Sequence, residues 1–173
     1  MKPITIFLAG PGAAPELPEY LKSSGLVEKV CSFNSAHGSR DPRRVSVPGP
    51  VTAGASLNSA LEQASSKYVL VINNEIVPGH RCLERLLDAA QATGACMVYP
   101  DYYLDDGHGL ERRELIDYQP GSVREGFDFG SMAMFSAGTP LITIVSKIKP
   151  RPAMIIPNDA IISSFIKFSC SWR

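Results

Sequence analysis

Polar side chains follow two short apolar runs of this 173-residue chain, at the points where both runs are predicted to end as strands. Asn73, Asn74 and Glu75 come directly after the run at 68–72, and Asp101 follows the second run. A carboxylate can bind a divalent cation, and amide groups can hold a ribose or a base. Parallel strands of one sheet would carry these groups to a single ligand-binding edge. Because Asn-Asn is also good turn chemistry, a purely structural turn is the alternative.

Short apolar runs alternate with amphipathic segments, and this alternation predicts the elements that position those groups. The helix expected at 56–65 repeats its apolar residues at the spacing of one buried face, and Ser56 is its expected N-cap. The fold class is therefore α/β, with a mostly parallel sheet, helices on both faces and the strand 68–72 in its centre. Strands are expected at 4–9, 27–33, 45–47, 68–72, 96–99 and 131–135, and helices at 15–24, 56–65 and 78–94.

Four residues outside the two strand ends are further candidate contacts of the same crevice. Gly10 follows the first strand, where a glycine lets the backbone approach a base or a phosphate. Asn34 ends the second strand, and Gly54 and Asn58 lie at the start of the helix that precedes 68–72. An ordinary tight turn is the alternative for Gly10, because the chain lacks the full glycine fingerprint of dinucleotide-binding folds.

A turn and an aromatic loop follow the strand at 96–99. Residues 105–109 combine Asp, Gly and His, which predicts the turn of a hairpin. The segment 117–130 is rich in glycine, aromatic rings and hydrogen-bonding groups, a composition that suits a sugar-binding loop. We therefore expect Tyr102, Arg124 and Phe127 to contact a sugar.

The overall composition restricts the partners and the compartment. Lys plus Arg and Asp plus Glu number 17 each, so the net charge of zero gives no electrostatic case for nucleic acid or an anionic membrane. No apolar stretch is long enough to span a bilayer. The apolar run near the N-terminus is too short for the hydrophobic region of a signal peptide. The four cysteines are scattered without zinc-site spacing, which favours a reduced, cytoplasmic setting. They are Cys31, Cys82, Cys96 and Cys170.

Several motifs, taken in order, resemble the family-2 inverting glycosyltransferases with the GT-A fold. The likeness covers about residues 4–136, and its later motifs resemble a bacterial branch of that family. It implies a Rossmann-like GT-A sheet, a nucleotide-diphosphate sugar as donor and a sugar or lipid-linked acceptor, in cell-wall or polysaccharide biosynthesis. The motifs are Gly54, Ser56 and Asn58, the segments 67–78, 83–86 and 98–102, and the segment 117–131 with Asp117, Tyr118, Gly121 to Arg124 and Phe127 to Ser131.

The resemblance also implies a metal. In that family the strand equivalent to 68–72 ends in Asp-x-Asp, whose last Asp ligates Mg²⁺ or Mn²⁺ and so helps to neutralise the departing nucleotide diphosphate. Aligned on the following Val-Pro, Asn73 stands at the first Asp and Glu75 at the second. Glu75 is the implied metal ligand, and Asn73, Asn74 and Asp101 are implied donor contacts. Since Asn73 brings no charge, weakened metal binding is expected.

The second half of the family pattern is missing. A Glu-Asp pair supplies the general base of that family after the strand equivalent to 131–135, and no such pair follows Phe135 here. Asp128 is the nearest candidate base, and Asp159 is a remote second. We expect a nucleotide-sugar-binding domain at 1–136 and an atypical tail at 137–173, read as a non-native continuation.

Three functions follow from these residues. The first is transfer of a sugar from a nucleotide-diphosphate sugar to an acceptor hydroxyl, with inversion. The second is a non-catalytic or degenerate domain that binds a nucleotide sugar without turnover, which the missing base favours. The third is a sugar-nucleotidyltransferase, suggested by the opening loop at 8–12, although no Arg or Lys lies between residues 10 and 21 to meet a triphosphate.

Overall fold

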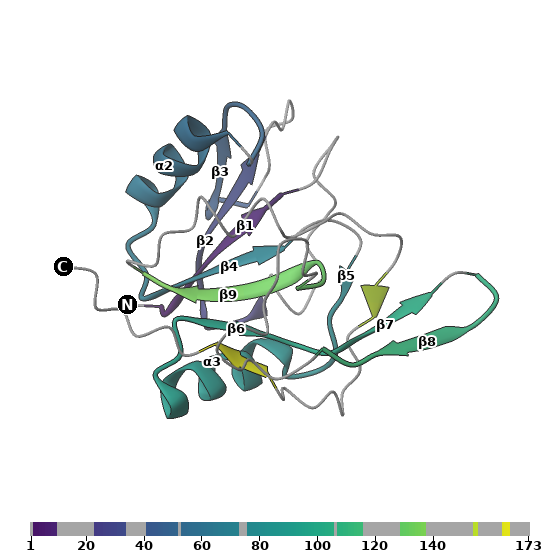
Figure 1. Cartoon of the computed structure of the whole chain (residues 1–173). Coiled ribbons are helices and arrows are strands. Elements are labelled where there is room, and N and C mark those ends of the chain that lie inside the picture. The colour runs from purple at the N-terminus through teal and green to yellow at the C-terminus, as the bar shows by residue number, and fades with distance from the viewer. Residues whose placement is uncertain are drawn as a thin grey trace.

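The computed structural model of the chain describes residues 2–9, 23–33, 41–51, 53–72, 76–105, 107–115 and 129–137, and the backbone at 154–155 and 164–166. A seven-stranded sheet with the order β11-β6-β9-β4-β1-β2-β3 forms its centre (Figure 1). The strands are β1 (Ile4–Leu8), β2 (Val27–Phe33), β3 (Arg44–Val47), β4 (Tyr68–Ile72), β6 (Met97–Tyr99), β9 (Met132–Ser136) and β11 (Ser164–Ile166). The helices whose bounds both lie within the described segments are α2 (Gly54–Gln63) and α3 (Cys82–Thr93).

The sheet is mixed, with most of its strands in one direction. β1 pairs in parallel with β2 and β4, and β2 pairs in parallel with β3. β9 is antiparallel to both of its neighbours, β4 and β6, so β6 runs in the same direction as β4. β11 is antiparallel to β6, which leaves five strands in one direction and two in the other. The prediction of an α/β fold with 68–72 as the central strand is confirmed.

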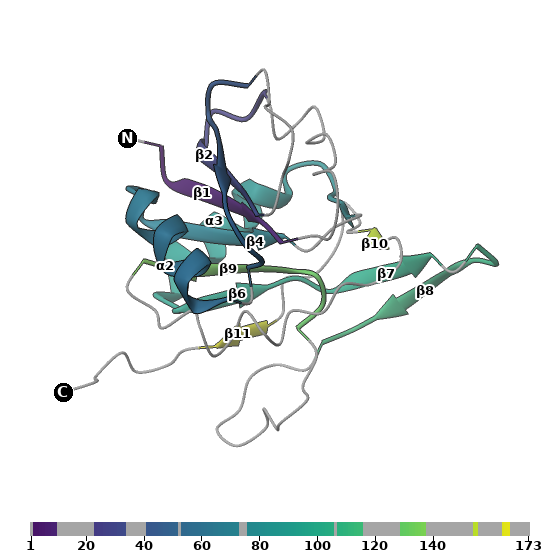
Figure 2. The same cartoon turned by 90° about the horizontal axis from the view of Figure 1, so that it is seen from above.

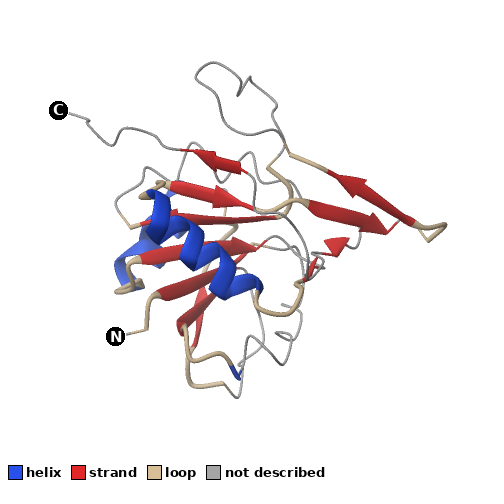
Figure 3. Ribbon diagram, turned by 90° about the horizontal axis from the view of Figure 1, so that it is seen from below, coloured by secondary structure: helices blue, strands red, loops and turns tan. Residues whose placement is uncertain are grey.

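The helices α2 and α3 of the described segments cover opposite faces of this sheet (Figures 2 and 3). Leu70 of β4 belongs to a buried cluster with Leu86 of α3, whereas the next residue, Val71, belongs to a second cluster with Leu57 of α2. Successive side chains of a strand point to opposite faces, so a strand between two helical layers must be apolar at every position. All five residues of β4 are buried, which explains the unbroken apolar run.

The C-terminal end of α3 agrees with the sequence prediction, whereas the N-terminal end of α2 differs from it. Gly94 is the C-cap of α3 in the left-handed conformation, as its position predicts. The predicted N-cap Ser56 is wrong, because α2 begins at Gly54 and its N-cap, Ala53, makes no side-chain cap bond. The Ser56 hydroxyl instead donates to the Pro48 carbonyl at 2.7 Å and ties the first turn of α2 to the end of β3.

A second, smaller sheet has the order β5-β10-β7-β8 and projects from the body as a hairpin arm (Figure 1). The predicted turn at 105–109 is confirmed, and Gly107 N–H donates to the Asp105 carboxylate there at 2.9 Å. β10 lies between β5 and β7, so part of the segment read as an atypical tail pairs with the preceding domain. The strands are β5 (Ile76–Val77), β7 (Tyr102–Asp105), β8 (Leu110–Arg113) and β10 (Met154–Ile155).

Two further findings concern membrane-spanning helices and the cysteines. Neither helix of the described segments has the length and hydropathy that a bilayer crossing needs. Cys31 and Cys82 are buried free thiols. Cys96 is disulfide-bonded, to a partner outside the described segments, and this differs from the reduced chain predicted from the scattered cysteines.

Candidate functional site

The order of the strands reverses between β1 and β4, at the centre of the large sheet. β2 and β3 lie on the far side of β1, whereas β9 and β6 lie on the far side of β4. The Ala9 N–H donates to the Ile72 carbonyl at 2.8 Å, so the pairing of the two strands continues to the last residue of β4. In open α/β sheets, ligands bind at such a reversal, outside the carboxyl ends of the strands. Gly10 and Asn73 each follow one of these two ends in the chain.

The end of β6 and the start of β9 lie at the same edge. Ile72 is opposite Met132 in the antiparallel pairing, so the residues before β9 lie beside the end of β4. Tyr99, the last residue of β6, packs edge-on against Phe129 with ring centroids 5.2 Å apart, and both rings are buried. Asp128 immediately precedes Phe129 in the chain. Phe129 and Gly130, at the C-terminal end of the aromatic segment 117–130, therefore lie at this edge.

Asp101 is buried at this edge and has a structural contact. Its side chain is 5% exposed, and its Oδ1 accepts a hydrogen bond from the Leu115 N–H at 2.8 Å. Leu115 follows β8, so the carboxylate joins the end of the main sheet to the return of the hairpin arm. The donor contact expected of Asp101 stays a prediction, and any donor would share the carboxylate with this backbone bond.

Tyr102 lies in the core instead of on the surface expected for an acceptor contact. It is 3% exposed and packs in the cluster that α3 covers, and Leu104 packs against the same cluster. Because side chains alternate along β7, the residue between them, Tyr103, points to the other side and is partly exposed. Strand alternation places the two tyrosines on opposite sides of β7, but which of them faces the core depends on how β7 packs against the cluster.

The start of α2 lies near the same edge, since it follows the end of β3. Gly54 is the first residue of α2, and Asn58 is exposed one turn later. Gly49 has φ of +84°, and a side chain there would meet the Ser56 hydroxyl, which is held by Pro48. This tight turn fixes where the helix begins and therefore where Gly54 and Asn58 lie relative to the strand ends.

The remaining predicted site residues lie outside the described part of the chain, and their placement stays a prediction. Within the described part, no group of three or more His, Cys, Asp and Glu side chains could hold a metal ion. The described residues therefore supply no complete ligand set for the cation that the resemblance implies. The residues outside are Gly10, Asn34, Asn73, Asn74, Glu75, Arg124, Phe127 and Asp128.

Charged side chains on the β2–β3 connection are engaged with one another. Two hydrogen bonds join Arg43 to the Asp41 carboxylate, from Nε at 3.1 Å and from Nη2 at 2.9 Å. The side-chain bonds from Arg43, followed by a backbone bond from the same residue, lower the pKa of Asp41 to about 2. Arg44 donates through Nε to the Ser32 hydroxyl at 2.7 Å. These contacts orient the arginines toward the protein itself.

The two free thiols are not nucleophile candidates. Burial raises the pKa of Cys31 to about 11, with Lys29 opposing the shift, and raises the pKa of Cys82 to about 12. A thiol reacts as its thiolate, so both side chains are inert at neutral pH. Their role is packing: Cys82 Sγ lies 3.9 Å from the sulfur of Met132 in the core.

No protein-family model matches the chain, and no curated protein matches it. The features of the chain that bear on a function are the reversal of strand order and the polar residues near the carboxyl ends of the strands. Of the predicted site residues, Gly54 and Asn58 of α2 and Asp101 after β6 lie at or near one edge of the sheet.

Proposed function

We propose that this chain has a Rossmann-like GT-A fold and acts as a family-2-type glycosyltransferase. Its donor would be a nucleotide-diphosphate sugar, and its acceptor a hydroxyl of a sugar or of a lipid-linked saccharide. The observation that carries the proposal is the reversal of strand order between β1 and β4, at the centre of a mixed sheet. Sheets of this kind hold nucleotides at that point, and the polar motif at 73–75 follows β4 directly in the chain.

The proposed reaction is a direct displacement. The acceptor oxygen attacks the anomeric carbon of the donor while the bond to the nucleotide diphosphate breaks, which inverts the configuration. An aspartate takes the proton of the attacking hydroxyl, and Asp128 is the proposed base. Asn73, Asn74 and Gly10 are proposed to hold the nucleotide. A divalent cation bound by Glu75 would supply charge neutralisation for the leaving diphosphate.

Calorimetry with uridine diphosphate tests this proposal. We expect the full chain to bind it about tenfold more tightly with Mn²⁺ than with a chelator, and Glu75→Ala to remove that difference. Glu62 is an exposed acid on α2, so Glu62→Ala removes the same charge elsewhere and should change nothing. If the parent chain binds none of the uridine, guanosine, adenosine and thymidine diphosphates, the proposal is wrong. Equal affinity with and without metal rejects only the cation.

A non-catalytic nucleotide-sugar-binding domain is the second candidate function. Two observations favour it: Asp101 holds Leu115, and Tyr102 lies in the core, so both side chains have structural roles. The missing Glu-Asp pair points the same way. Release of nucleotide diphosphate from a nucleotide sugar, lost in Asp128→Asn, would support the enzyme. Binding without any release, with or without candidate acceptors, would support the second function.

A further inference from the structure

The small sheet has an inner side, which contacts the core, and an outer side. Ile76, Tyr102 and Leu104 all pack with the cluster under α3, so these positions of β5 and β7 face inward. Their neighbours Val77 and Tyr103 must face outward, because strand side chains alternate. The strand register agrees with this. Val77 and Tyr103 are both paired with Ile155 of β10, and paired residues of a sheet lie on the same side of it.

The outward positions gather a distinctive set of side chains. Tyr103 is opposite Arg112, and Asp105 is opposite Leu110, so these four residues share the outer side with Val77. Val77 is 59% exposed and Leu110 is 58% exposed, and in the described part of the chain these are the exposed large apolar residues. Both therefore lie on one side of one small sheet. We call Val77, Tyr103, Asp105, Leu110 and Arg112 the outer face.

We propose that the outer face binds the sugar of the acceptor, an inference that rests on the proposed function. The partly exposed ring of Tyr103 offers a flat apolar surface to the C–H groups of a pyranose. Arg112 can donate hydrogen bonds to the hydroxyls, and Val77 and Leu110 flank the ring position. Asp105 carries acceptor oxygens on the same side.

The chain continues directly from the candidate donor edge into this face. β5 begins at the residue after Glu75, and β7 begins at the residue after Asp101. β10 pairs with both β5 and β7, so the two strands that follow the donor edge belong to one sheet. An acceptor on the outer face would therefore lie on elements that leave the place where the donor is proposed to bind.

The composition of the outer face favours a sugar over a lipid surface or a second protein. Among its described side chains, Asp105 and Arg112 are charged and Tyr103 carries a hydroxyl, so three of the five can form hydrogen bonds. A membrane-binding face is strongly apolar, and a stable protein interface is much larger than five residues. One aromatic ring with hydrogen-bonding groups beside it is typical of a small polar ligand site.

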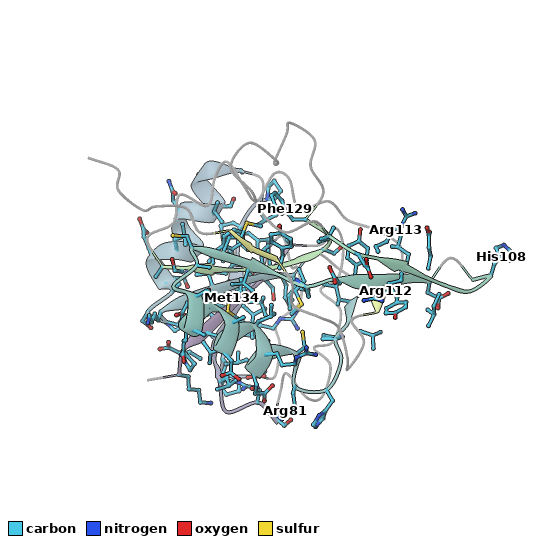
Figure 4. All side chains as sticks on the ribbon, turned by 60° about the horizontal axis from the view of Figure 1, so that its bottom comes forward. Arg81, His108, Arg112, Arg113, Phe129 and Met134 are labelled. Carbon is cyan, nitrogen blue, oxygen red and sulfur yellow. The ribbon has the colours of Figure 1, made fainter. Side chains whose placement is uncertain are left out.

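β8 provides a matched pair of variants. Arg112 and Arg113 are neighbours and lie on opposite sides of the hairpin arm (Figure 4). Arg112 pairs with Glu114 at 3.0 Å, and Arg113 pairs with Glu111 at 2.8 Å. The arginines are 48% and 50% exposed, so each ion pair contributes little to stability. Arg113→Ala thus removes the same charge from the side away from the outer face.

The test is binding of the full chain to an array of bacterial and mammalian glycans, with uridine diphosphate affinity measured on every variant. We expect Tyr103→Ala and Arg112→Ala to lower glycan affinity about tenfold or more, as loss of a central contact does. Tyr103→Phe keeps the ring and should stay within about threefold of the parent. Arg113→Ala should bind as the parent does. None of the four changes should alter uridine diphosphate binding.

Two results would overturn the proposal. The first is that the parent chain binds no glycan on the array; binding to vesicles of phosphatidylglycerol and phosphatidylcholine through Arg112 would then identify a membrane contact. The second is that Arg113→Ala loses as much glycan affinity as Arg112→Ala. Glycan binding without any nucleotide diphosphate binding would reject the proposed function and leave the outer face as a carbohydrate site. Thermal unfolding of each variant checks that it is folded.

Discussion

The Asp101 carboxylate accepts a hydrogen bond from the Leu115 N–H at 2.8 Å, across 14 residues of chain. Asp101 follows β6 at the candidate donor edge, and Leu115 follows β8 at the base of the hairpin arm. The bond therefore fixes the arm, and with it the outer face, against the large sheet. A side chain that the sequence predicts as a ligand contact thus also sets the relative position of the two proposed binding surfaces.

Asp101→Ala should lower the free energy of unfolding by about 1–3 kcal/mol, because the Leu115 N–H loses its acceptor in a partly buried place. Asp101→Asn keeps an acceptor oxygen and should cost clearly less. Urea unfolding of the two variants measures the difference. If the carboxylate also contacts the donor, the Asn variant will be folded and will bind uridine diphosphate more weakly. Parent-like stability in both variants would contradict the structural role.

Gly49 should not tolerate a side chain. Its φ of +84° is left-handed, which costs an L-residue about 1–2 kcal/mol, and a Cβ there meets the Ser56 hydroxyl. Gly49→Ala should therefore lower the free energy of unfolding by more than the backbone term alone. Gly54→Ala is the control, since nothing lies within 4 Å of the added carbon and the helix favours alanine.

A double-mutant cycle separates the two causes at Gly49. Ser56→Ala alone should cost about 1 kcal/mol, because the bond to the Pro48 carbonyl is lost. In that background the Gly49→Ala change no longer meets a hydroxyl, so it should cost less than it does in the parent. Strict additivity of the two changes would show that only the backbone conformation matters.

The Asp41–Arg43 pair should make stability depend on acid pH. The folded-state pKa of Asp41, about 2, lies below its ordinary value of 3.8, so the stabilisation is complete above that value and is lost as pH falls toward 2. Both side chains are partly exposed, and the pair should contribute about 1 kcal/mol or less near neutral pH. Asp41→Asn should be slightly less stable there and equal to the parent near pH 2. A constant difference across this range would contradict it.

The central part of the fold follows from the sequence because burial leaves a clear pattern there. The run at 68–72 is apolar at all five positions, as only a strand covered on both faces requires, and it is the middle strand of the sheet. Gly94 ends α3 as predicted, since its left-handed conformation suits glycine. These features depend on local chemistry and on burial, which the sequence carries directly.

Features that depend on tertiary partners could not be predicted. β8 is exposed at every position, so it shows no apolar alternation, and only its pairing with β7 makes it a strand. Ser56 has the chemistry of an N-cap, but its hydroxyl is engaged by Pro48. Tyr102 and Tyr103 look alike in the sequence. Their opposite placement depends on where the inward side of β7 meets the core.

Cys31 and Cys82 should react slowly with thiol reagents while the chain is folded. Burial raises the pKa of Cys31 from its ordinary value of 9.0 to about 11, so the thiolate fraction near pH 8 is about a hundredfold lower than for a free cysteine. Cys82 should be slower still. Mass spectrometry after labelling with iodoacetamide, without reductant, reports each site. Urea should abolish the protection, and rapid labelling of the folded chain would contradict the burial of either thiol.

The last prediction concerns the polar motif that follows β4. If the motif at 73–75 is a weakened Asp-x-Asp, restoring the carboxylate in Asn73→Asp should raise the affinity for Mn²⁺ in the presence of uridine diphosphate. A second charge beside the ion adds attraction that desolvation partly offsets, and we expect about tenfold, or roughly 1.4 kcal/mol. Gln91→Glu is the matched control, because Gln91 is exposed on α3 and the change adds the same charge. The turn interpretation predicts no gain from Asn73→Asp, since Asn and Asp serve turns equally well. An unchanged affinity would therefore reduce the motif to a turn, and the glycosyltransferase reading would then rest on the strand reversal alone.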